Sequence, residues 1–409
     1  MVPEIYLLST EINIKPVRIK SIDVFRGLTM LLMIFVNDFW TLVDIPDWLK
    51  HAKADEDFLG FSDIIFPAFL FIVGLSIPFA MDNRMAKGYS TRSIGQHIFT
   101  RSFALLLMGI FMVNRENIYA DGVWIGKYWW QIFMALAFFL IWNNYSQVRM
   151  DERLKKTLVG VGVAILVFLA IIFRGGDSED PIWMRTYWWG ILGLIGWAYL
   201  YSALIYLIFK GRLQVLIIAW VFFLVFNLLD FSGWLDFAKG IRSYFWIAGS
   251  GAFPAFTMAG VVASALYKKI STSNDYVKRF IWLLFLLGGL MLIFGLATRP
   301  MFGISKIRAT PAWIGMCSGI AILAYAFLYW LIDVKQKHRW TWIVGPAGSS
   351  TLTCYLVPYF YYAIISLLSV GLPIALRTGW VGLIKSLLFG FLIVAITGLF
   401  NKAYISLKI

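Results

Sequence analysis

The sequence predicts an all-α fold, a polytopic membrane bundle of about 11 or 12 transmembrane helices with its N-terminus in the cytoplasm. Of its 409 residues, 60% are hydrophobic and 14% are charged, against roughly 45 to 50% and about 25% in globular chains. The mean hydropathy is +0.77, and aromatic residues, which favour membrane-water interfaces, make up 18%. This composition excludes a soluble enzyme, a disordered chain and, with two cysteines, a disulfide scaffold.

Apolar runs of about 17 to 25 residues are long enough to cross a hydrocarbon core of roughly 30 Å. Candidate runs occur, in order, at 22–43, 59–81, 94–113, 125–142, 154–173, 188–209, 213–230, 245–267, 280–297, 312–332, 343–370 and 379–400. Lys127 and Gln131 interrupt the fourth run, and only three residues, 210–212, separate the sixth from the seventh. The number of helices therefore stays open by one.

The basic residues predict the orientation. Most of the 36 Lys and Arg residues fall in the segments that lie inside if the N-terminus is cytoplasmic, so both termini are expected there. This asymmetry accounts for the net charge of +14 without nucleic acid as a partner. The exception is the outer loop 298–311, which carries Arg299, Lys306 and Arg308 and no acid.

The chain reads as a single transmembrane domain, residues 1–409. It contains no linker rich in Pro, Gly or Ser and no sustained repeat. The first twenty residues lack an apolar core that ends in small residues, so we expect no cleavable signal peptide. The expected location is the cell's inner (plasma) membrane, with the bilayer as a partner.

Ionisable or strongly polar residues inside a span are costly and are candidates for function. The first run carries Asp23, Arg26, Asn37 and Asp38. Asp23 and Arg26 are three residues apart, share a helix face and can pair, which alone could explain them. Asn37 lies about 21 Å further along the helix axis, near the outer end, where an amide can equally serve helix packing.

The outer loop after the first run places a histidine among acids. His51 lies between Asp47 and the run Asp55, Glu56, Asp57. An imidazole there could act as a general base, although an ordinary surface histidine fits the same pattern. A single histidine lacks the paired spacing of a zinc site, and no HExxH, CxxC, GxSxG or dinucleotide motif occurs, so we predict no metal.

The motifs of the first two runs carry a resemblance. D-x-F-R-G stands at Asp23–Gly27, His51-Ala52 follows, and D-x-x-F-P-x-F-x-F-x-x-G stands at Asp63–Gly74. The sequence strongly resembles the heparan-alpha-glucosaminide N-acetyltransferase family, and more narrowly its bacterial relatives with a domain of unknown function. The motifs cover about residues 1–115, and Gln131, Ser305-Lys306 and 346–355 match more loosely.

The resemblance implies a membrane acetyltransferase. It would move acetyl from cytoplasmic acetyl-CoA, a co-substrate, to an amino sugar or other glycan acceptor on the periplasmic side. The family's catalytic histidine falls on His51 and its neighbouring asparagine on Asn37. His51 would serve as general base or as acetyl carrier, and the amide of Asn37 could stabilise an oxyanion. The acidic stretch between Asn37 and His51 replaces a glycine-rich connection that is common in the family, which leaves the acceptor open.

Further residues are expected to bind the two substrates. Arg26 and Arg101, with Asp23 beside Arg26, are candidates for the CoA phosphates, because Arg makes bidentate phosphate contacts. On the acceptor side the candidates are Asp38, Asp63, Gln131 and Lys306. The loop acids could also attract a cationic amino sugar. A homodimer is compatible with the resemblance, although no span carries a distinctive interface pattern.

Three other interpretations stay open. Twelve spans with both ends inside also suit a secondary transporter of a sugar or glycan intermediate. An O-acyltransferase acting on a glycan hydroxyl would share the fold and differ in the acceptor. A non-enzymatic component of an envelope complex is the third. The sequence leaves undecided whether transfer is direct or passes through an acetyl-histidine.

Overall fold

The computed structural model describes residues 19–119, 122–177, 179–238, 240 and 247–409. Three of the expectations above fall outside these residues in whole or in part. They are the expected absence of a signal peptide, the part of the basic-residue asymmetry carried by Lys15, Arg18, Lys239 and Arg242, and the first residues of the run at 245–267.

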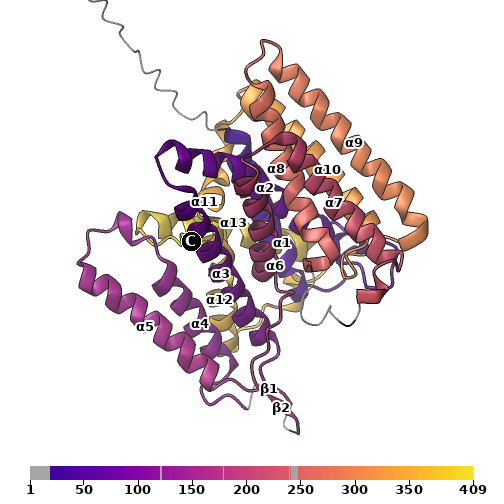
Figure 1. The fold of residues 1–409 in the computed structure, drawn as a ribbon. Coiled ribbons are helices and arrows are strands. Elements are labelled where there is room, and N and C mark those ends of the chain that lie inside the picture. Colours follow the sequence, from indigo (N-terminus) through magenta and orange to yellow (C-terminus); the bar gives the residue numbers. More distant parts are fainter. Residues whose placement is uncertain (1–18, 120–121, 178, 239, 241–246) are drawn as a thin grey trace, which may run out of the picture.

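Thirteen α-helices make up most of the described chain (Figure 1). In order they are α1 (Lys20–Asn37), α2 (Ser62–Ala86), α3 (Thr91–Glu116), α4 (Lys127–Trp142), α5 (Glu152–Ile171), α6 (Ile191–Ile208), α7 (Leu213–Phe231), α8 (Ala252–Ile270), α9 (Tyr276–Phe302), α10 (Pro311–Tyr329), α11 (Gly345–Ser349), α12 (Thr351–Leu367) and α13 (Gly379–Lys402). A short hairpin pairs β1 (Gly175–Gly176) with β2 (Pro181–Ile182). The all-α prediction is confirmed.

Among the described residues, nine helices are long and apolar enough to cross a membrane. Three more long helices match predicted runs but are shorter or more polar. α4 and α12 have 16 and 17 residues, and α1 carries Lys20, Asp23 and Arg26 within its 18 residues. The chain is a multi-pass membrane protein.

Two predicted runs end differently from the expectation. The run at 22–43 is helical only to Asn37, and a 3-10 turn, Asp38–Thr41, follows it. The run at 343–370 is two helices, α11 and α12, because Ser350 leaves the helical region with φ −128° and ψ 54°. The short α11 lies against α1, where a Cβ on Gly348 would come within 2.5 Å of the carbonyl oxygen of Asp23.

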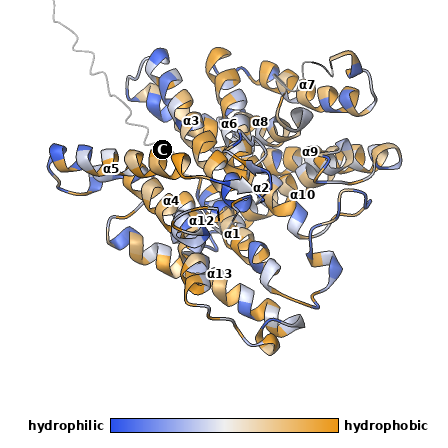
Figure 2. Ribbon diagram, turned by 90° about the horizontal axis from the view of Figure 1, so that it is seen from below, coloured by the Kyte–Doolittle hydropathy of each residue, from blue (hydrophilic) through white to orange (hydrophobic). Residues whose placement is uncertain are grey.

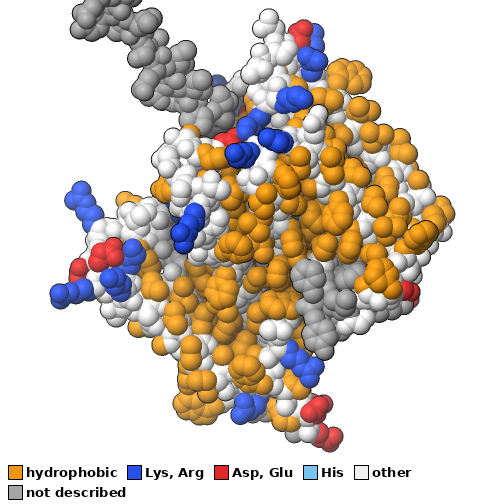
Figure 3. All heavy atoms as spheres, in the orientation of Figure 1, with side chains coloured by type: hydrophobic (Ala, Val, Ile, Leu, Met, Phe, Trp, Pro, Cys, Tyr) orange, Lys and Arg blue, Asp and Glu red, His pale blue; other side chains and the backbone are white. Residues whose placement is uncertain are grey.

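The helices differ in how much of their surface other helices cover. Figure 2 shows α1 and α2 near the middle of the bundle, with α5, α7, α9 and α13 at its edge. The spans of α2 and α8 are 72% and 83% buried, whereas those of α5 and α7 are 17% and 22% buried. On the face drawn in Figure 3, hydrophobic side chains cover a broad continuous area and charged side chains gather toward its margins. Lipid therefore covers the edge helices, since water would make such a surface costly.

Glycines set the closest helix contact of the core, between α2 and α8. A Cβ on Gly74 would lie 1.8 Å from the carbonyl oxygen of Thr257, and one on Gly260 would lie 2.0 Å from that of Phe71. Small residues let two backbones approach this closely, as is common between membrane helices. This contact fixes α2, which carries Asp63 at its N-terminal end.

Three backbone bridges each join two loops at the same end of the bundle. The isolated bridges join Val43 to Thr378, Ile118 to Gly175, and Asn143 to Leu407. Each bridge joins two segments that the charge pattern assigns to the same side, the first two outer and the third inner. The order of the helices is thus consistent with the predicted alternation of directions.

Candidate active site

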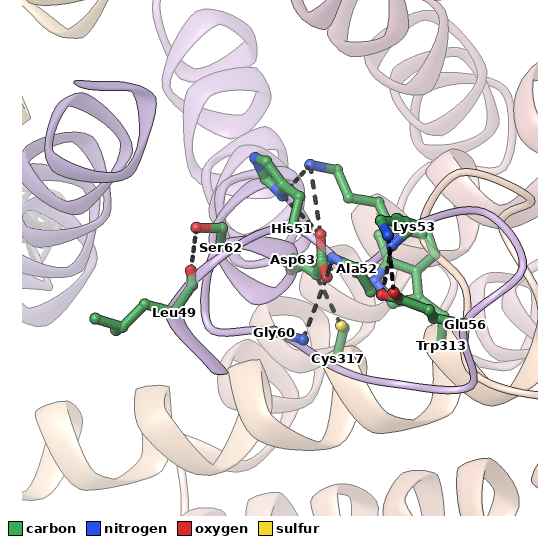
Figure 4. Close-up of polar contacts among 11 residues, drawn as sticks. Leu49, His51, Ala52, Lys53, Glu56, Gly60, Ser62, Asp63, Trp313 and Cys317 are labelled. Atoms are coloured by element: carbon green, nitrogen blue, oxygen red, sulfur yellow. Dashed lines mark hydrogen bonds and ion pairs between the residues drawn. The ribbon is translucent and has the colours of Figure 1, made fainter. Parts of the chain in front are cut away.

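A histidine and an aspartate meet at the N-terminal end of α2, on the side that the charge pattern predicts to be the outer one (Figure 4). His51 lies in the loop between α1 and α2, and Asp63 lies in the first turn of α2. Nδ1 of His51 is 2.7 Å from Oδ1 of Asp63. The Asp63 side chain is 1% exposed, whereas that of His51 is 47% exposed. A buried carboxylate therefore orients an imidazole that stays open to its surroundings.

Backbone groups hold Asp63 in place. Its Oδ2 accepts hydrogen bonds from the amides of Ala52 (3.0 Å) and Gly60 (3.2 Å), and its carbonyl oxygen accepts one from Nε1 of Trp313 (3.2 Å). Gly60 permits the loop to fold back, because a Cβ there would lie 1.9 Å from the carbonyl oxygen of Lys50. The first turn of a helix also favours a negative charge. Asp63 is thus a fixed anion beside His51.

The hydrogen bonds assign the proton on the His51 ring. An ionised carboxylate only accepts, so the proton shared with Asp63 belongs to Nδ1 of His51. In a neutral ring the lone pair of Nε2 is then available to accept a proton. We make this assignment from the hydrogen-bond pattern. The same logic orients the histidine of Ser-His-Asp enzymes, where a buried aspartate fixes the tautomer of the general base.

A second outer loop, residues 303–310 between α9 and α10, is clamped to the His51 loop. Asp57 pairs with Arg299 (3.0 Å) and accepts a hydrogen bond from the amide of Ile304 (2.7 Å). The hydroxyl of Ser305 donates to the carbonyl oxygen of Ala54 at 3.1 Å. The Ile304 amide, and then Arg299, lower the pKa of Asp57 below its ordinary 3.8, although burial opposes them. The clamp therefore stays charged at neutral pH.

The clamp brings a lysine to the histidine. Nζ of Lys306 lies 3.1 Å from Nδ1 of His51 and 3.8 Å from Oδ1 of Asp63. Arg299 and Lys306, which broke the expected charge pattern of the outer loops, thus both have acidic partners, Asp57 in the His51 loop and Asp63 in the first turn of α2. The loop acids are correspondingly less free than the sequence suggested, since Asp47 also pairs with Lys50 at 2.8 Å.

The other candidates from the outer end of α1 lie apart from this group. Asn37, the last residue of α1, is exposed, and no hydrogen bond joins it to His51 among the described contacts. Asp38 is 2% exposed and accepts hydrogen bonds from Tyr362, Lys385 and Ser386, each at 2.6 Å. Its carboxylate thus ties the end of α1 to α12 and α13.

Gln131 is also part of an internal contact. It is 1% exposed, accepts a hydrogen bond from Nε of Arg115 (2.7 Å) and donates one to the carbonyl oxygen of Tyr359 (2.6 Å). These bonds join α3, α4 and α12. In the described part of the chain, Gln131 and Asp38 therefore belong to separate clusters, whereas Asp63 and Lys306 meet His51.

A cavity of about 420 Å³ opens at the other end of the bundle, among α1, α2, α3, α6 and α12. Arg26 lines it, donating to Oδ1 of Asp23 (3.2 Å) and to the hydroxyl of Ser76 (2.6 Å). Its other cationic and histidine lining residues are Arg84, His97, Arg101 and Lys408. The predicted cluster of Arg26 and Arg101 therefore faces one cavity, which Asp23 reaches through Arg26.

The cavity has an unsatisfied donor suited to an anion. Nε of Arg101 is buried and has no hydrogen-bond partner among the described residues, and its guanidinium carbon lies 4.7 Å from the ring centroid of Tyr199. Arg84 donates to Nε2 of His97 at 2.9 Å. A phosphate oxygen would satisfy the free Arg101 donor, because guanidinium groups bind phosphates with paired hydrogen bonds.

Two residues of the cavity, His97 and Lys408, were not among the substrate-binding candidates named from the sequence. The spacing of His97 could have indicated it as a candidate, because His97 precedes Arg101 by four residues and therefore lies on the same face of α3. Lys408 had no such signal, because it reaches the cavity through a non-local bridge between Leu407 and Asn143. No group of three or more His, Cys, Asp or Glu that could hold a metal ion occurs in the described residues.

Comparisons with known proteins match the N-terminal part of the chain. Residues 18–175 match the family model described as heparan-alpha-glucosaminide N-acetyltransferase, catalytic. Heparan-alpha-glucosaminide N-acetyltransferase of Homo sapiens is 37% identical over 103 residues, which are 24% of this chain and 14% of that protein. The Mus musculus protein is 35% identical over 101 residues, with the same coverage. The resemblance is confirmed over this segment, which contains His51 and Asp63 but not Lys306.

Proposed function

We propose that the protein is an acetyl-CoA-dependent membrane acetyltransferase, because residues 18–175 match the family model of the heparan-alpha-glucosaminide N-acetyltransferase catalytic domain. The acetyl group would pass from acetyl-CoA at the inner, cytoplasmic end to an amino sugar or other glycan acceptor at the outer, periplasmic end. The observation that carries the proposal is the pairing of half-exposed His51 with buried Asp63 at one end of a bundle whose other end holds a basic cavity.

The proposed reaction uses the free lone pair of His51. The acceptor amine or hydroxyl attacks the thioester carbonyl, so that a C–N or C–O bond forms and the C–S bond breaks. Nε2 of His51 takes the acceptor proton and passes it to the leaving CoA thiolate. A general base contributes roughly 10²- to 10⁴-fold to such a step. Asp63 fixes the ring and stabilises the imidazolium that forms between the two proton transfers.

The cavity is proposed as the donor site. Arg26, Arg84, Arg101 and Lys408 would hold the phosphates of CoA, and the apolar remainder would take the pantetheine arm. Its lining on α2 runs from Arg84 to Phe69, a rise of about 22 Å. From Phe69 to Asp63 the helix rises about 9 Å more. Acetyl delivery to His51 therefore requires the side chains at this end of the cavity to move aside.

The geometry changes the proposed roles of four sequence candidates. The buried Asp63, bonded to His51, fits a positioning role better than acceptor binding. Asp38 and Gln131 are occupied by internal hydrogen bonds and fit structural roles. Exposed Asn37 keeps the proposed oxyanion role, which requires its amide to reach the thioester carbonyl.

The direct test is an acetyl-transfer assay on the purified full-length protein with labelled acetyl-CoA. Acceptors are glucosamine, glucosamine-terminated oligosaccharides and neutral hexoses, which separate transfer to nitrogen from transfer to oxygen. In vesicles, acetyl-CoA is added on one side and acceptor is trapped on the other. Product formed across the membrane supports the proposal, and the absence of transfer to any acceptor, with folded protein, contradicts it.

Arg101→Gln is expected to raise KM for acetyl-CoA about tenfold or more while leaving kcat nearly unchanged. The reason is that the side chain would bind the phosphates equally in the ground and transition states. Arg92→Gln is the matched control, because Arg92 is exposed on the first turn of α3 and does not line the cavity. Steady-state kinetics at saturating acceptor measure both constants. An unchanged KM in Arg101→Gln would place the phosphates elsewhere.

A further inference from the structure

A partly buried cation lies next to the Asp63–His51 pair. The Lys306 side chain is 28% exposed, and its Nζ lies 3.1 Å from Nδ1 of His51 and 3.8 Å from Oδ1 of Asp63. Its loop is held by the hydroxyl of Ser305, bonded to the carbonyl oxygen of Ala54, and by the Ile304 amide, bonded to Asp57. Several independent bonds therefore fix this lysine at the histidine.

Lys306 cannot act on Nδ1 of His51 through a hydrogen bond. Nδ1 has a single in-plane position, and the ionised Asp63, at 2.7 Å, takes the proton there. A lysine ammonium has only donors, so it cannot accept that same proton. The effect of Lys306 on the pair is therefore electrostatic, exerted by its charge on Asp63 and on the ring.

We propose that Lys306 balances the charge of Asp63 so that His51 stays neutral between turnovers and is free to accept a proton. This inference rests on the proposed function of His51 as a proton acceptor. A buried carboxylate alone beside an imidazole favours the imidazolium, which has no lone pair to offer. Asp63 and Lys306 together carry no net charge, so the ring keeps the orienting bond without being charged at rest.

Three further ion pairs lie on or beside the His51 loop, whereas the exposed Asp44 and Asp55 have no ion-pair partner among the described residues. The three pairs are Lys50–Asp47 at 2.8 Å, Lys53–Glu56 at 3.7 Å and Arg299–Asp57 at 3.0 Å. From α10, the buried thiol of Cys317 faces the carbonyl oxygen of Asp63 at 3.7 Å. The site also changes the pKa of Lys306. Burial lowers this pKa below its ordinary value of 10.5, and the charge of Asp63 opposes that shift.

The test measures protonation of His51 directly. The sequence has three histidines, His51, His97 and His338, so ring C–H signals of the full-length protein in detergent can be followed by NMR against pH and assigned with His51→Gln. Lys306→Gln is expected to raise the pH of half-protonation of His51 by about one unit or more. Lys306→Arg keeps the charge and should keep the wild-type midpoint. The acid limb of kcat/KM should move with the midpoint.

Lys53→Gln is the matched control, because Lys53 lies two residues from His51, is exposed and pairs with Glu56. Lys306→Met, which retains the apolar stem, is the second charge-removing variant if Lys306→Gln does not fold. An unchanged or lowered midpoint in the folded charge-removing variant overturns the inference. If the midpoint rises in a protein that transfers acetyl to no acceptor, the proposed function fails while the charge balance stands.

Discussion

His51→Gln is expected to reduce acetyl transfer by about 10²- to 10⁴-fold without loss of folded protein. Nε2 of His51 is the proposed proton acceptor, and glutamine cannot take up a proton at neutral pH. The side chain is 47% exposed, so its replacement leaves no large cavity in the core. Initial rates with labelled acetyl-CoA measure the loss, and elution from size-exclusion chromatography together with the melting temperature checks the fold.

His338→Gln is the matched control for this variant. His338 lies in the segment between α10 and α11, with Nε2 3.4 Å from Nζ of Lys20, and it does not line the cavity. It should keep wild-type activity. If His51→Gln transferred acetyl to every acceptor at the wild-type rate, His51 would not be the proton acceptor. A mass increase of one acetyl group on His51, seen when acetyl-CoA is added without acceptor, would favour a covalent intermediate over direct transfer.

Asp63→Asn is expected to cost a comparable factor, about 10²- to 10⁴-fold in kcat/KM. Asparagine keeps the shape of the side chain but removes the negative charge that holds the Nδ1 proton of His51. An amide group that turns its NH₂ toward the ring would stabilise the other tautomer, with the proton on Nε2, where acceptor attack needs a lone pair. Oδ2 of Asp63 also accepts two backbone amides, so some loss of thermal stability should accompany the kinetic loss.

Asp44→Asn is the control that distinguishes a loss of catalysis at the site from a general effect of removing a charge from this loop. Asp44 lies on the same outer loop, is exposed and has φ 51°, a conformation that asparagine tolerates well. Its activity should match that of the wild type. Full activity of Asp63→Asn would show that the buried carboxylate only stabilises the loop. The double variant of His51 and Asp63 should be little worse than His51→Gln alone, because residues that act as a unit are not additive.

The membrane-spanning helices could be predicted because their signal is local. A span needs a continuous apolar run of bilayer length, and each predicted run overlaps one helix, or two in the case of 343–370. The breaks were harder to foresee. The end of α1 at Asn37 and the break at Ser350 depend on contacts such as the close approach of Gly348 to α1, which no single run contains.

The candidate site was only partly predictable for the same reason. His51 stood out through its acidic loop and its family motif, and the pairing of Asp23 with Arg26 followed from their spacing. Asp38 and Gln131 looked similar in the sequence, yet internal partners on distant helices occupy them. A polar residue in a span is costly whether it binds substrate or another helix, so sequence alone does not separate the two uses.

The sequence by itself determined that this is a multi-pass helical membrane protein, and it singled out one histidine in the loop between the first two spans. Hydropathy and charge asymmetry suffice for this because the bilayer acts on each segment separately. Only the tertiary structure decided which charges meet. Asp63 is 12 residues from His51 and Lys306 is 255 residues away, and only the folding of α2 and of the α9–α10 loop brings both to one ring.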